Sequence, residues 1–200
     1  MWTWFIKGGP LMWPILICSI LTFTAVIERI IFLITEKRRS NPKLVQQLWR
    51  LTEQGRFDEA GKVAEGSEDS VATVLREGLV HRDTSLTDAM MEAASADLER
   101  YNRGLVILDT AVTLGPLLGL LGTVYGMMHS FGLIGGADLA SQQKVITGGI
   151  AESLIAVSFG LVVAIVAIVP FNFLNSRLEK QRRKLESAMT RMEILVAKVK

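Results

Sequence analysis

The most constraining feature of this sequence is an apolar run near its C-terminal end, residues 145–176, in which Glu152 is the one charged residue. A run of this length can cross a lipid bilayer as a single helix, since about 20 apolar residues suffice. A carboxylate near the centre of such a helix costs about 2.5–3.5 kcal/mol, so it faces protein or water rather than lipid. The sequence therefore predicts a membrane protein with a polar feature inside the membrane.

Two further apolar segments accompany this run, so we predict three spanning helices at residues 11–34, 105–133 and 146–174. The mean hydropathy of +0.34 is higher than a soluble domain with 21% charged residues usually reaches. Lys7 and the first apolar segment could be read as a signal peptide, but no cleavage site of small residues closes the segment. The predicted fold class is all-α, with three spans, long helices that extend into the cytoplasm and a helical cytoplasmic insert.

Lysine and arginine are distributed unevenly between the segments that flank the spans. Residues 36–104 carry eleven and residues 175–200 carry eight, whereas the N-terminal stretch has only Lys7 and the loop between the last two spans has only Lys144. The positive-inside rule places the two basic segments in the cytoplasm. The predicted organisation is the N-terminus with the first span (1–35), a cytoplasmic helical insert (36–104), the second span (105–134), a short loop on the opposite side (135–145), the third span (146–175) and a cytoplasmic C-terminal helix (176–200).

Helix start and stop signals divide the insert. Asn41-Pro42 opens a helix that Gly55 ends, and two short helices are expected at residues 57–66 and 71–78. Asp83-Thr84-Ser85 supplies capping residues for a long helix from Leu86, which we expect to run unbroken into the second span because it contains no proline before Leu114. The third span is expected to continue as an amphipathic helix to Lys200. The apolar stripe of this helix consists of Leu178, Leu185, Met189, Met192, Val196 and Val199. It needs a partner from this chain or from a neighbouring subunit.

Small residues recur at helical spacing in the second and third spans. They form one stripe of Gly115, Gly119, Gly122 and Gly126, and another of Ser153, Ala156, Gly160, Ala164 and Ala167. Such stripes let neighbouring helices approach closely. They have two interpretations, namely ordinary packing within one protomer or contact between protomers. Two long stripes in a chain with three spans suggest more packing surface than one protomer can use, which favours an oligomer.

Polar side chains in the spans also have two interpretations each. Thr113 and Thr123 lie about 80° apart around the second span and roughly 15 Å apart along it, so both hydroxyls could line one water-accessible path. Alternatively, each hydroxyl bonds back to a carbonyl of its own helix. Glu152 is either part of an ion path or subunit contact, or a structural acid paired with a neighbouring polar group.

Several function classes lack support in the sequence. It has no P-loop, nucleophile elbow, HExxH motif or dinucleotide fingerprint, so we predict no catalytic residues and no cofactor. The single cysteine, Cys18, excludes an intrachain disulfide, and His81 and His129 lack ligand spacing, so no metal site is expected. No basic patch is interleaved with aromatic residues, so nucleic-acid binding is not expected. If the chain does energetic work, the energy comes from an ion gradient.

Two segments resemble the hallmark sequences of the MotA/TolQ/ExbB proton-channel family. They are GPLLGLLGTVYGMMHSF at residues 115–131 and GIAESLIAVSFGLVVAIVAIVPFN at residues 149–172. The Glu28-Arg29 pair and the order of three spans also fit, and three spans favour the ExbB/TolQ branch. The resemblance implies a bacterial inner-membrane protein with a periplasmic N-terminus and a cytoplasmic C-terminus. It further implies a homopentamer around a dimer of a single-span ExbD/TolR-like partner whose aspartate relays protons.

The same resemblance implies roles for individual residues. Thr123 falls on a pore-lining hydroxyl position and Glu152 on the glutamate of the third span. The second pore threonine is replaced here by Val157, with Ser158 following it. One residue turns a side chain about 100° around the helix, so either Ser158 supplies the hydroxyl from another angle or this site is less polar. The predicted ion pathway is therefore Thr113, Thr123, Glu152 and Ser158.

We predict that the chain is not an enzyme but the subunit of a motor or energy-transduction complex driven by the proton motive force. A sodium-driven version of the same motor is an alternative. A second alternative is a non-conducting membrane scaffold, in which the small-residue stripes only assemble a complex. A secondary transporter subunit would be expected to show inverted repeats and broken helices, and the sequence has neither.

Overall fold

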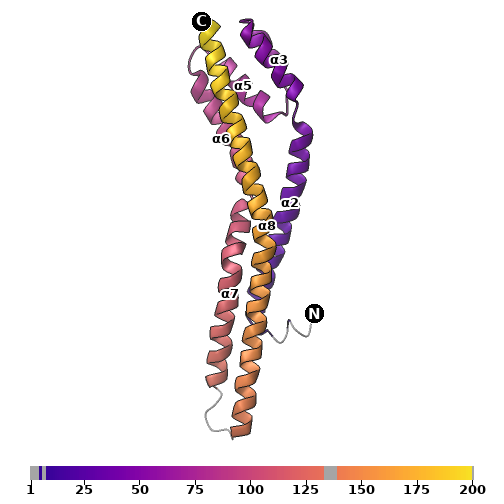
Figure 1. Ribbon diagram of the computed structural model, residues 1–200, viewed down its shortest axis with the longest axis vertical. Helices are drawn as coiled ribbons and strands as arrows, with labels where there is room; N and C mark the ends of the chain where they lie inside the picture. Colours follow the sequence, from indigo (N-terminus) through magenta and orange to yellow (C-terminus); the bar gives the residue numbers. More distant parts are fainter. Residues whose placement is uncertain (1–4, 6–7, 133–138, 200) are drawn as a thin grey trace. The chain divides into compact units, whose positions relative to one another are not determined.

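A computed structural model describes residues 5, 8–132 and 139–199 of the chain. Within these residues it contains seven helices and no strand, which confirms the all-α class. The helices are α2 (Met12–Arg39), α3 (Pro42–Glu53), α4 (Phe57–Val63), α5 (Ser70–Val80), α6 (Leu86–Asn102), α7 (Leu105–Gly132) and α8 (Leu139–Val199), as Figure 1 shows.

Three of these helices are long and apolar enough to cross a membrane. They are α2, α7 and the part of α8 from Val145, with mean hydropathy of 2.1, 1.9 and 2.8 in their most apolar windows. A helix pairs its backbone N–H and C=O groups within itself. Each of these segments can therefore cross the hydrocarbon core without exposing unpaired polar backbone. The three predicted spans are therefore confirmed as helices, and the sides of the membrane to which their ends belong remain a prediction.

The chain divides into two compact units, each described here by itself. The first, which we call the apolar unit, combines Met1–Glu28 with Gly104–Phe173. The second, the polar unit, combines Arg29–Arg103 with Leu174–Lys200. The helices α2 and α8 each contribute residues to both units.

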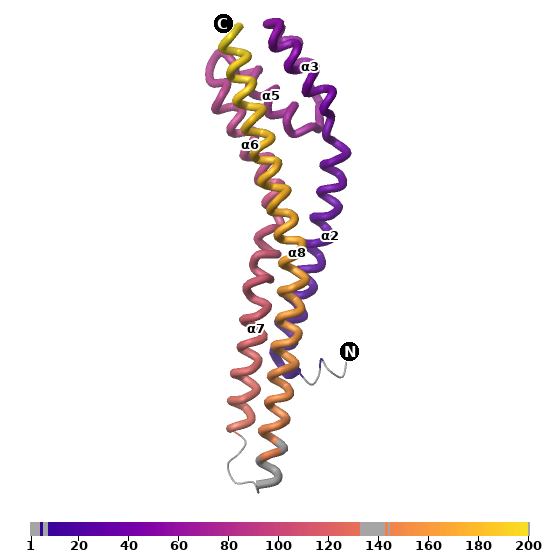
Figure 2. The backbone as a smooth tube through the Cα atoms, in the orientation of Figure 1, coloured from indigo at the N-terminus to yellow at the C-terminus, as the bar shows by residue number. Residues whose placement is uncertain are grey.

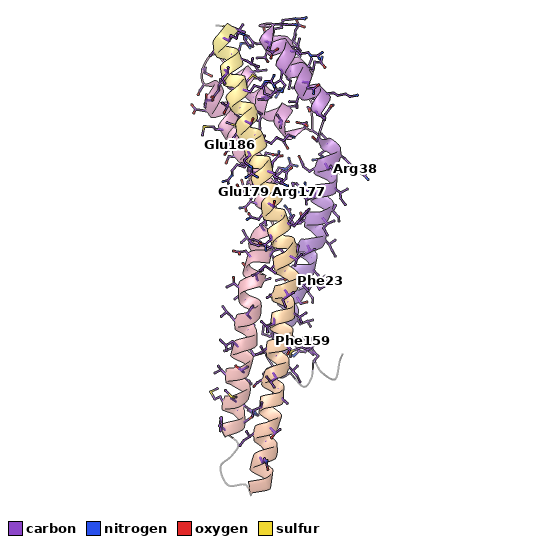
Figure 3. The ribbon with its side chains drawn as sticks, viewed as in Figure 1. Phe23, Arg38, Phe159, Arg177, Glu179 and Glu186 are labelled. Carbon is purple, nitrogen blue, oxygen red and sulfur yellow. The ribbon has the colours of Figure 1, made fainter. Side chains whose placement is uncertain are left out.

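In the apolar unit, α7 and the first part of α8 lie side by side along most of their length (Figures 1 and 2). The beginning of α2 packs on them through a small cluster of buried side chains. The cluster is formed by Met12, Ile15, Ala156 and Val163, with Phe5, Cys18, Leu118 and Ile155 partly buried against it. Large apolar side chains such as Phe23 and Phe159 remain exposed on α2 and α8 (Figure 3). An apolar exposed surface on long helices is what lipid or a neighbouring protomer covers.

The polar unit has the larger core. It buries side chains of α3, α4 with the residue that follows it, α5, α6 and α8 together: Leu48, Trp49, Ala60, Ala64, Val71, Ala72, Val74, Leu75, Leu79, Met90, Ala94, Leu185, Ala188, Met192 and Val196. The C-terminal stripe of α8 therefore finds its partner within this chain, in the insert. Glu186 lies on the outside beside the buried Leu185 (Figure 3), whereas Glu36, Asp69 and Asp97 of the same unit are buried.

The expectation that the helix from Leu86 runs unbroken into the second span is wrong. Helix α6 ends at Asn102, and Gly104 adopts a φ of +83° before α7 begins at Leu105. A residue with positive φ cannot continue a right-handed helix, and glycine adopts this conformation without steric cost. The absence of proline was therefore not a sufficient reason to predict a continuous helix.

The predicted start of α6 is correct in position. Ser85 is the residue that precedes the helix, but its hydroxyl donates to the Asp88 carboxylate instead of accepting from the helix backbone. The pair nevertheless places a negative charge in the first turn, where it interacts favourably with the helix dipole.

Candidate functional site

The glycines of α7 form its contact surface with α8 inside one protomer. If a Cβ atom were added to Gly115 it would lie 2.7 Å from the Gly160 carbonyl oxygen, and one on Gly119 would lie 2.9 Å from the Cα of Val157. The same substitution at Gly122 would bring a Cβ within 2.5 Å of the Cβ of Ala156. The two helices therefore touch backbone to backbone along this stripe.

The stripe continues toward the ends of the two spans. A Cβ on Gly126 would lie 2.5 Å from Oγ of Ser153, and Ala164 lies against Gly115. These contacts show that the two small-residue stripes pack against each other. The inference that they exceed what one protomer can use is therefore wrong, and they no longer argue for an oligomer.

The predicted hydroxyls of the ion pathway all donate to carbonyls of their own helices. Thr113 donates to Asp109 at 3.2 Å, Thr123 to Leu120 at 2.7 Å and Ser158 to Leu154 at 2.8 Å. The sequence left this arrangement open as one of two interpretations for the threonines. It does not preclude a role in a polar path, because a hydroxyl that donates still has lone pairs with which to accept.

These hydroxyls differ in exposure within the protomer. Thr113 and Ser158 are exposed, whereas Thr123 is half-buried beside α8. Ser153 of α8 lies 3.3 Å from the Thr123 carbonyl oxygen and donates to its own helix at Gly149, 2.8 Å away. Ser153, which follows Glu152 in the sequence, therefore contacts α7 at Thr123.

Glu152 points to a different surface of α8 from Ser158. The two residues are six positions apart, which places their side chains about 120° apart around the helix. The half-buried Glu152 carboxylate lies against the backbone of Gly9, at the start of the chain, and Ser158 is exposed. The structure thus does not gather the four predicted pathway residues on one face of one protomer.

Val157, at the position where the resemblance implies a threonine, lies toward α7. Its backbone is in contact range of Gly119, since a Cβ added there would approach both its Cα and its carbonyl oxygen, at 2.9 and 3.4 Å. The Val157 side chain is half-buried, while the neighbouring Ser158 is exposed. The two positions therefore present their side chains to different surroundings.

Sequence reasoning missed the segment that meets Glu152. Gly8 and Gly9 precede Pro10, and Gly9 has a φ of +75°. Two consecutive glycines before a proline are a turn signal that was available in the sequence. The signal did not say which side chain the turn would contact.

Sequence reasoning also missed a buried polar cluster in the polar unit. The Ser70 hydroxyl lies 2.7 Å from Oε1 of Glu36 and 3.0 Å from Oδ1 of Asp97. Arg100 forms ion pairs with both carboxylates, and Gln181 donates to Asp97 at 3.2 Å. These contacts join α2, α5, α6 and α8, which are far apart in the sequence.

Tyr101 belongs to the same cluster. Its ring packs edge-on against Phe32, with centroids 5.1 Å apart. Burial, and to a smaller extent the Glu36 and Asp97 carboxylates, raise the pKa of the Tyr101 phenol above its usual value. The carboxylates act in this direction because a phenolate would add a third negative charge.

The described residues offer no site for a resident metal ion. Among them, no group of three or more His, Cys, Asp or Glu side chains is placed to hold one. What the apolar unit provides instead is a tightly packed helix pair that carries exposed hydroxyls and one half-buried acid. Such a surface can accept hydrogen bonds and protons from a partner, but it lacks a nucleophile with its own base.

The chain matches one protein-family model. The model of the MotA/TolQ/ExbB proton channel family matches residues 66–187. This stretch includes all of α5, α6 and α7, and α8 as far as residue 187, within the polar unit. It contains each of the hydroxyls and the acid described above.

Individual proteins are similar over longer stretches. A protein of Synechocystis sp. named as ExbB-like 3 is 30% identical over 192 residues, covering 94% of this chain and 91% of that protein. A second Synechocystis protein, named as ExbB-like 1, is 32% identical over 205 residues, covering 98% of this chain and 78% of that protein. The Tol-Pal system protein TolQ of Haemophilus influenzae is 40% identical over 89 residues, covering 44% and 39% of the two chains.

Proposed function

The chain belongs to the MotA/TolQ/ExbB proton channel family, in its ExbB/TolQ branch, and from this premise we propose a specific role for it in a proton-driven motor. Membership makes it a multi-pass inner-membrane subunit for energy transduction, with protons as the transported ion. We propose in addition that five copies surround a dimer of a single-span ExbD/TolR-like partner, with the N-terminus periplasmic and the C-terminus cytoplasmic.

One observation carries this proposal, namely that Thr113 and Ser158 are exposed on a helix pair whose own contact surface is already filled. Hydroxyls that face outward from a membrane-spanning segment favour protein or water over lipid as their surroundings. A polar cavity enclosed by several protomers would supply such surroundings.

The chain lacks the acid that such a cavity would need for proton transfer across the bilayer. No Asp or Glu occurs between Asp109 and Asp138 or between Glu152 and Glu179, and the first span contains only Glu28, near its inner end. Because these acids lie toward the ends of the spans, a titratable carboxylate near the membrane centre would come from another chain. This gap supports a partner that contributes a relay aspartate to the cavity.

The hydroxyl of Thr123 provides the most direct test of the ion path. We expect Thr123→Val to abolish energised output while the protein still inserts and assembles, and Thr123→Ser to retain output because it keeps the hydroxyl. We expect Glu152→Ala to abolish output likewise. Wild-type output in both Thr123→Val and Glu152→Ala would remove these residues from the path.

Two further measurements separate the proposal from its alternatives. Addition of an uncoupler should stop the output of a proton-driven motor, whereas a scaffold would be indifferent and a sodium-driven motor would respond to a sodium ionophore. The mass of the complex extracted in detergent tests the assembly of five copies with two partner chains. A monomeric particle without a partner would contradict it.

A further inference from the structure

The turn before the first span is built so that its backbone rests on the carboxylate of Glu152. A Cβ added to Gly9 would overlap Oε1 of Glu152 and would lie 2.9 Å from its Cδ and 3.3 Å from its Cγ. A side chain at position 9 would therefore displace either the turn or the carboxylate. The φ of +75° at Gly9 is a second, independent reason why this position suits glycine.

Gly8 makes the neighbouring close approach. A Cβ at this position would lie 2.6 Å from Cγ of Met12 and 3.0 Å from Cγ2 of Ile155. Met12 is buried, and Ile155 packs in the same cluster. The two glycines thus bring consecutive peptide groups onto one patch of α8, formed by Glu152 and Ile155.

The turn is anchored on both sides of the glycines. Gly8 donates a backbone hydrogen bond to Phe5 at 3.3 Å, and Met12 donates one to Gly9 at 3.2 Å. The Phe5 ring packs edge-on against Trp13, with centroids 5.4 Å apart. The contact with Glu152 is therefore part of a packed segment rather than the chance position of a free end.

We propose that the Gly8-Gly9 turn is a positioning element that covers the Glu152 carboxylate and sets its access to water. The turn occupies one side of the carboxylate, and with the turn in place Glu152 is half-buried. A change that lifts the turn exposes the acid, and a change that fixes the turn shields it. The consequence for ion passage rests on the proposed role of Glu152, but the contact itself does not.

Labelling of the carboxyl group tests the proposal directly. A water-soluble carbodiimide reacts with accessible carboxyl groups, and mass spectrometry of the peptide that contains Glu152 measures the rate of labelling in membrane vesicles at one fixed pH. In Gly9→Ala we expect labelling about tenfold faster, the size expected when an extra methyl group disrupts a close contact. Identical rates in the wild type and Gly9→Ala would overturn the proposal.

Two control variants separate the contact from other effects of alanine. Gly66 has a φ of +72° and Gly148 is helical one turn before Glu152, and no atom lies within 4 Å of a Cβ added to either. We expect Gly66→Ala and Gly148→Ala to label as the wild type does. Glu152→Asp withdraws the carboxylate by one methylene, so combining it with Gly9→Ala should bring labelling back toward the rate of Glu152→Asp alone.

A crosslink serves as the second test, in case Gly9→Ala does not fold. In a Cys18→Ser background, Gly8→Cys and Ile155→Cys should form a disulfide on mild oxidation, since the two positions are in contact. The crosslinked protein should label more slowly at Glu152, and reduction should reverse this. Replacing Ile155→Cys by Leu154→Cys, which lies about 100° away around α8, should abolish the crosslink; equal crosslinking of both pairs would contradict the proposal.

These readouts do not depend on ion transport. Altered labelling in Gly9→Ala, together with normal output in Glu152→Ala, would support the positioning turn and reject the acid as part of the ion path. Unaltered labelling in Gly9→Ala, together with lost output in Glu152→Ala, would reject the positioning turn and support the acid as part of the ion path.

Discussion

The backbone N–H of Asn41 donates a 2.6 Å hydrogen bond to Oδ2 of Asp69, which lies 28 residues further along the chain. The other oxygen of Asp69 accepts from the N–H groups of Val71 and Ala72, at 2.9 and 3.0 Å, and so caps α5. Asn41 in turn caps α3 by accepting from Leu44 at 3.2 Å. One buried carboxylate therefore holds the starts of two helices of the polar unit together.

We predict that Asp69→Ala strongly destabilises the polar unit. Loss of a helix cap costs about 0.5–2 kcal/mol, and the part-buried hydrogen bond from the Asn41 N–H to the charged carboxylate contributes about 1.5–3 kcal/mol. A combined loss of about 2–4 kcal/mol in the free energy of unfolding is therefore expected. This loss is measured by denaturant unfolding of the purified protein in detergent, with the protease susceptibility of the insert as the readout.

Asn41→Ala is the matched control for this prediction. It removes only the side-chain cap of α3 and keeps the backbone N–H that bonds to Asp69. We expect a loss of about 1 kcal/mol, as for an exposed cap. Equal losses in the two variants would show that the bond between Asn41 and Asp69 contributes nothing.

The contact between α7 and α8 gives a second prediction. A Cβ on Gly160 would overlap the Gly115 carbonyl oxygen and lie 3.2 Å from the Cα of Gly119, both of which are backbone atoms. Because backbone cannot turn aside as a flexible side chain can, we expect Gly160→Ala to force the helices apart. The expected loss is about 1–3 kcal/mol in the free energy of unfolding, measured by thermal denaturation in detergent.

Gly148 on the same helix provides the comparison. A Cβ there meets open space, and alanine has the higher helix propensity, so Gly148→Ala should be neutral or raise stability by up to about 1 kcal/mol. If Gly160→Ala behaved in the same way, the close approach of the two helices would be refuted.

The helices themselves were largely predictable from the sequence, and their partners were not. Apolar length identified the three spans, and cap and stop signals placed the insert helices, with Asn41 and Gly55 near the ends of α3. Both signals are local, so a single sequence contains them. The break at Gly104 was missed although it is local, because the prediction considered proline and overlooked glycine as a helix terminator.

Contacts between distant segments could not be inferred in the same way. The spacing of Gly115 and Gly160 predicts that each helix can be approached closely, but not that they approach each other. Likewise nothing near Gly9 in the sequence indicates Glu152, and nothing near Ser70 indicates Glu36. Each of these pairings depends on how the helices pack, which periodicity along one helix does not specify.

The polar cluster around Tyr101 leads to a prediction about pH. Burial and the nearby Glu36 carboxylate raise the pKa of Tyr101 in the folded protein, whereas in the unfolded chain it is about 10. As the pH rises through that unfolded value, the unfolded state loses its proton while the folded state keeps it, so stability falls. Below that pH both states are protonated and Tyr101 contributes no dependence.

Ultraviolet titration of tyrosinate measures this directly. The chain has two tyrosines, so Tyr125→Phe leaves Tyr101 as the only signal. We expect Tyr101 to ionise at a higher pH than free tyrosine, and Glu36→Gln to lower its pKa because a negative charge is removed. Ionisation at the ordinary pKa, or no response to Glu36→Gln, would contradict the arrangement.

The last prediction concerns Val157 and Ser158, the two residues at the place where the resemblance implies a second pore hydroxyl. If the exposed Ser158 hydroxyl serves the ion path, Ser158→Ala should lower proton-driven output by about tenfold or more, since a hydrogen bond to a charged group is worth about 1.5–3 kcal/mol. Val157→Thr places a hydroxyl on the side of α8 that faces α7, about 100° around the helix from Ser158, so in the double variant with Ser158→Ala it should not restore output. Output relative to wild type at a fixed proton gradient, with complex mass as the control for assembly, measures both effects. Full output in Ser158→Ala alone would show that the site works without a second hydroxyl, and the half-buried Val157 would then mark a less polar path.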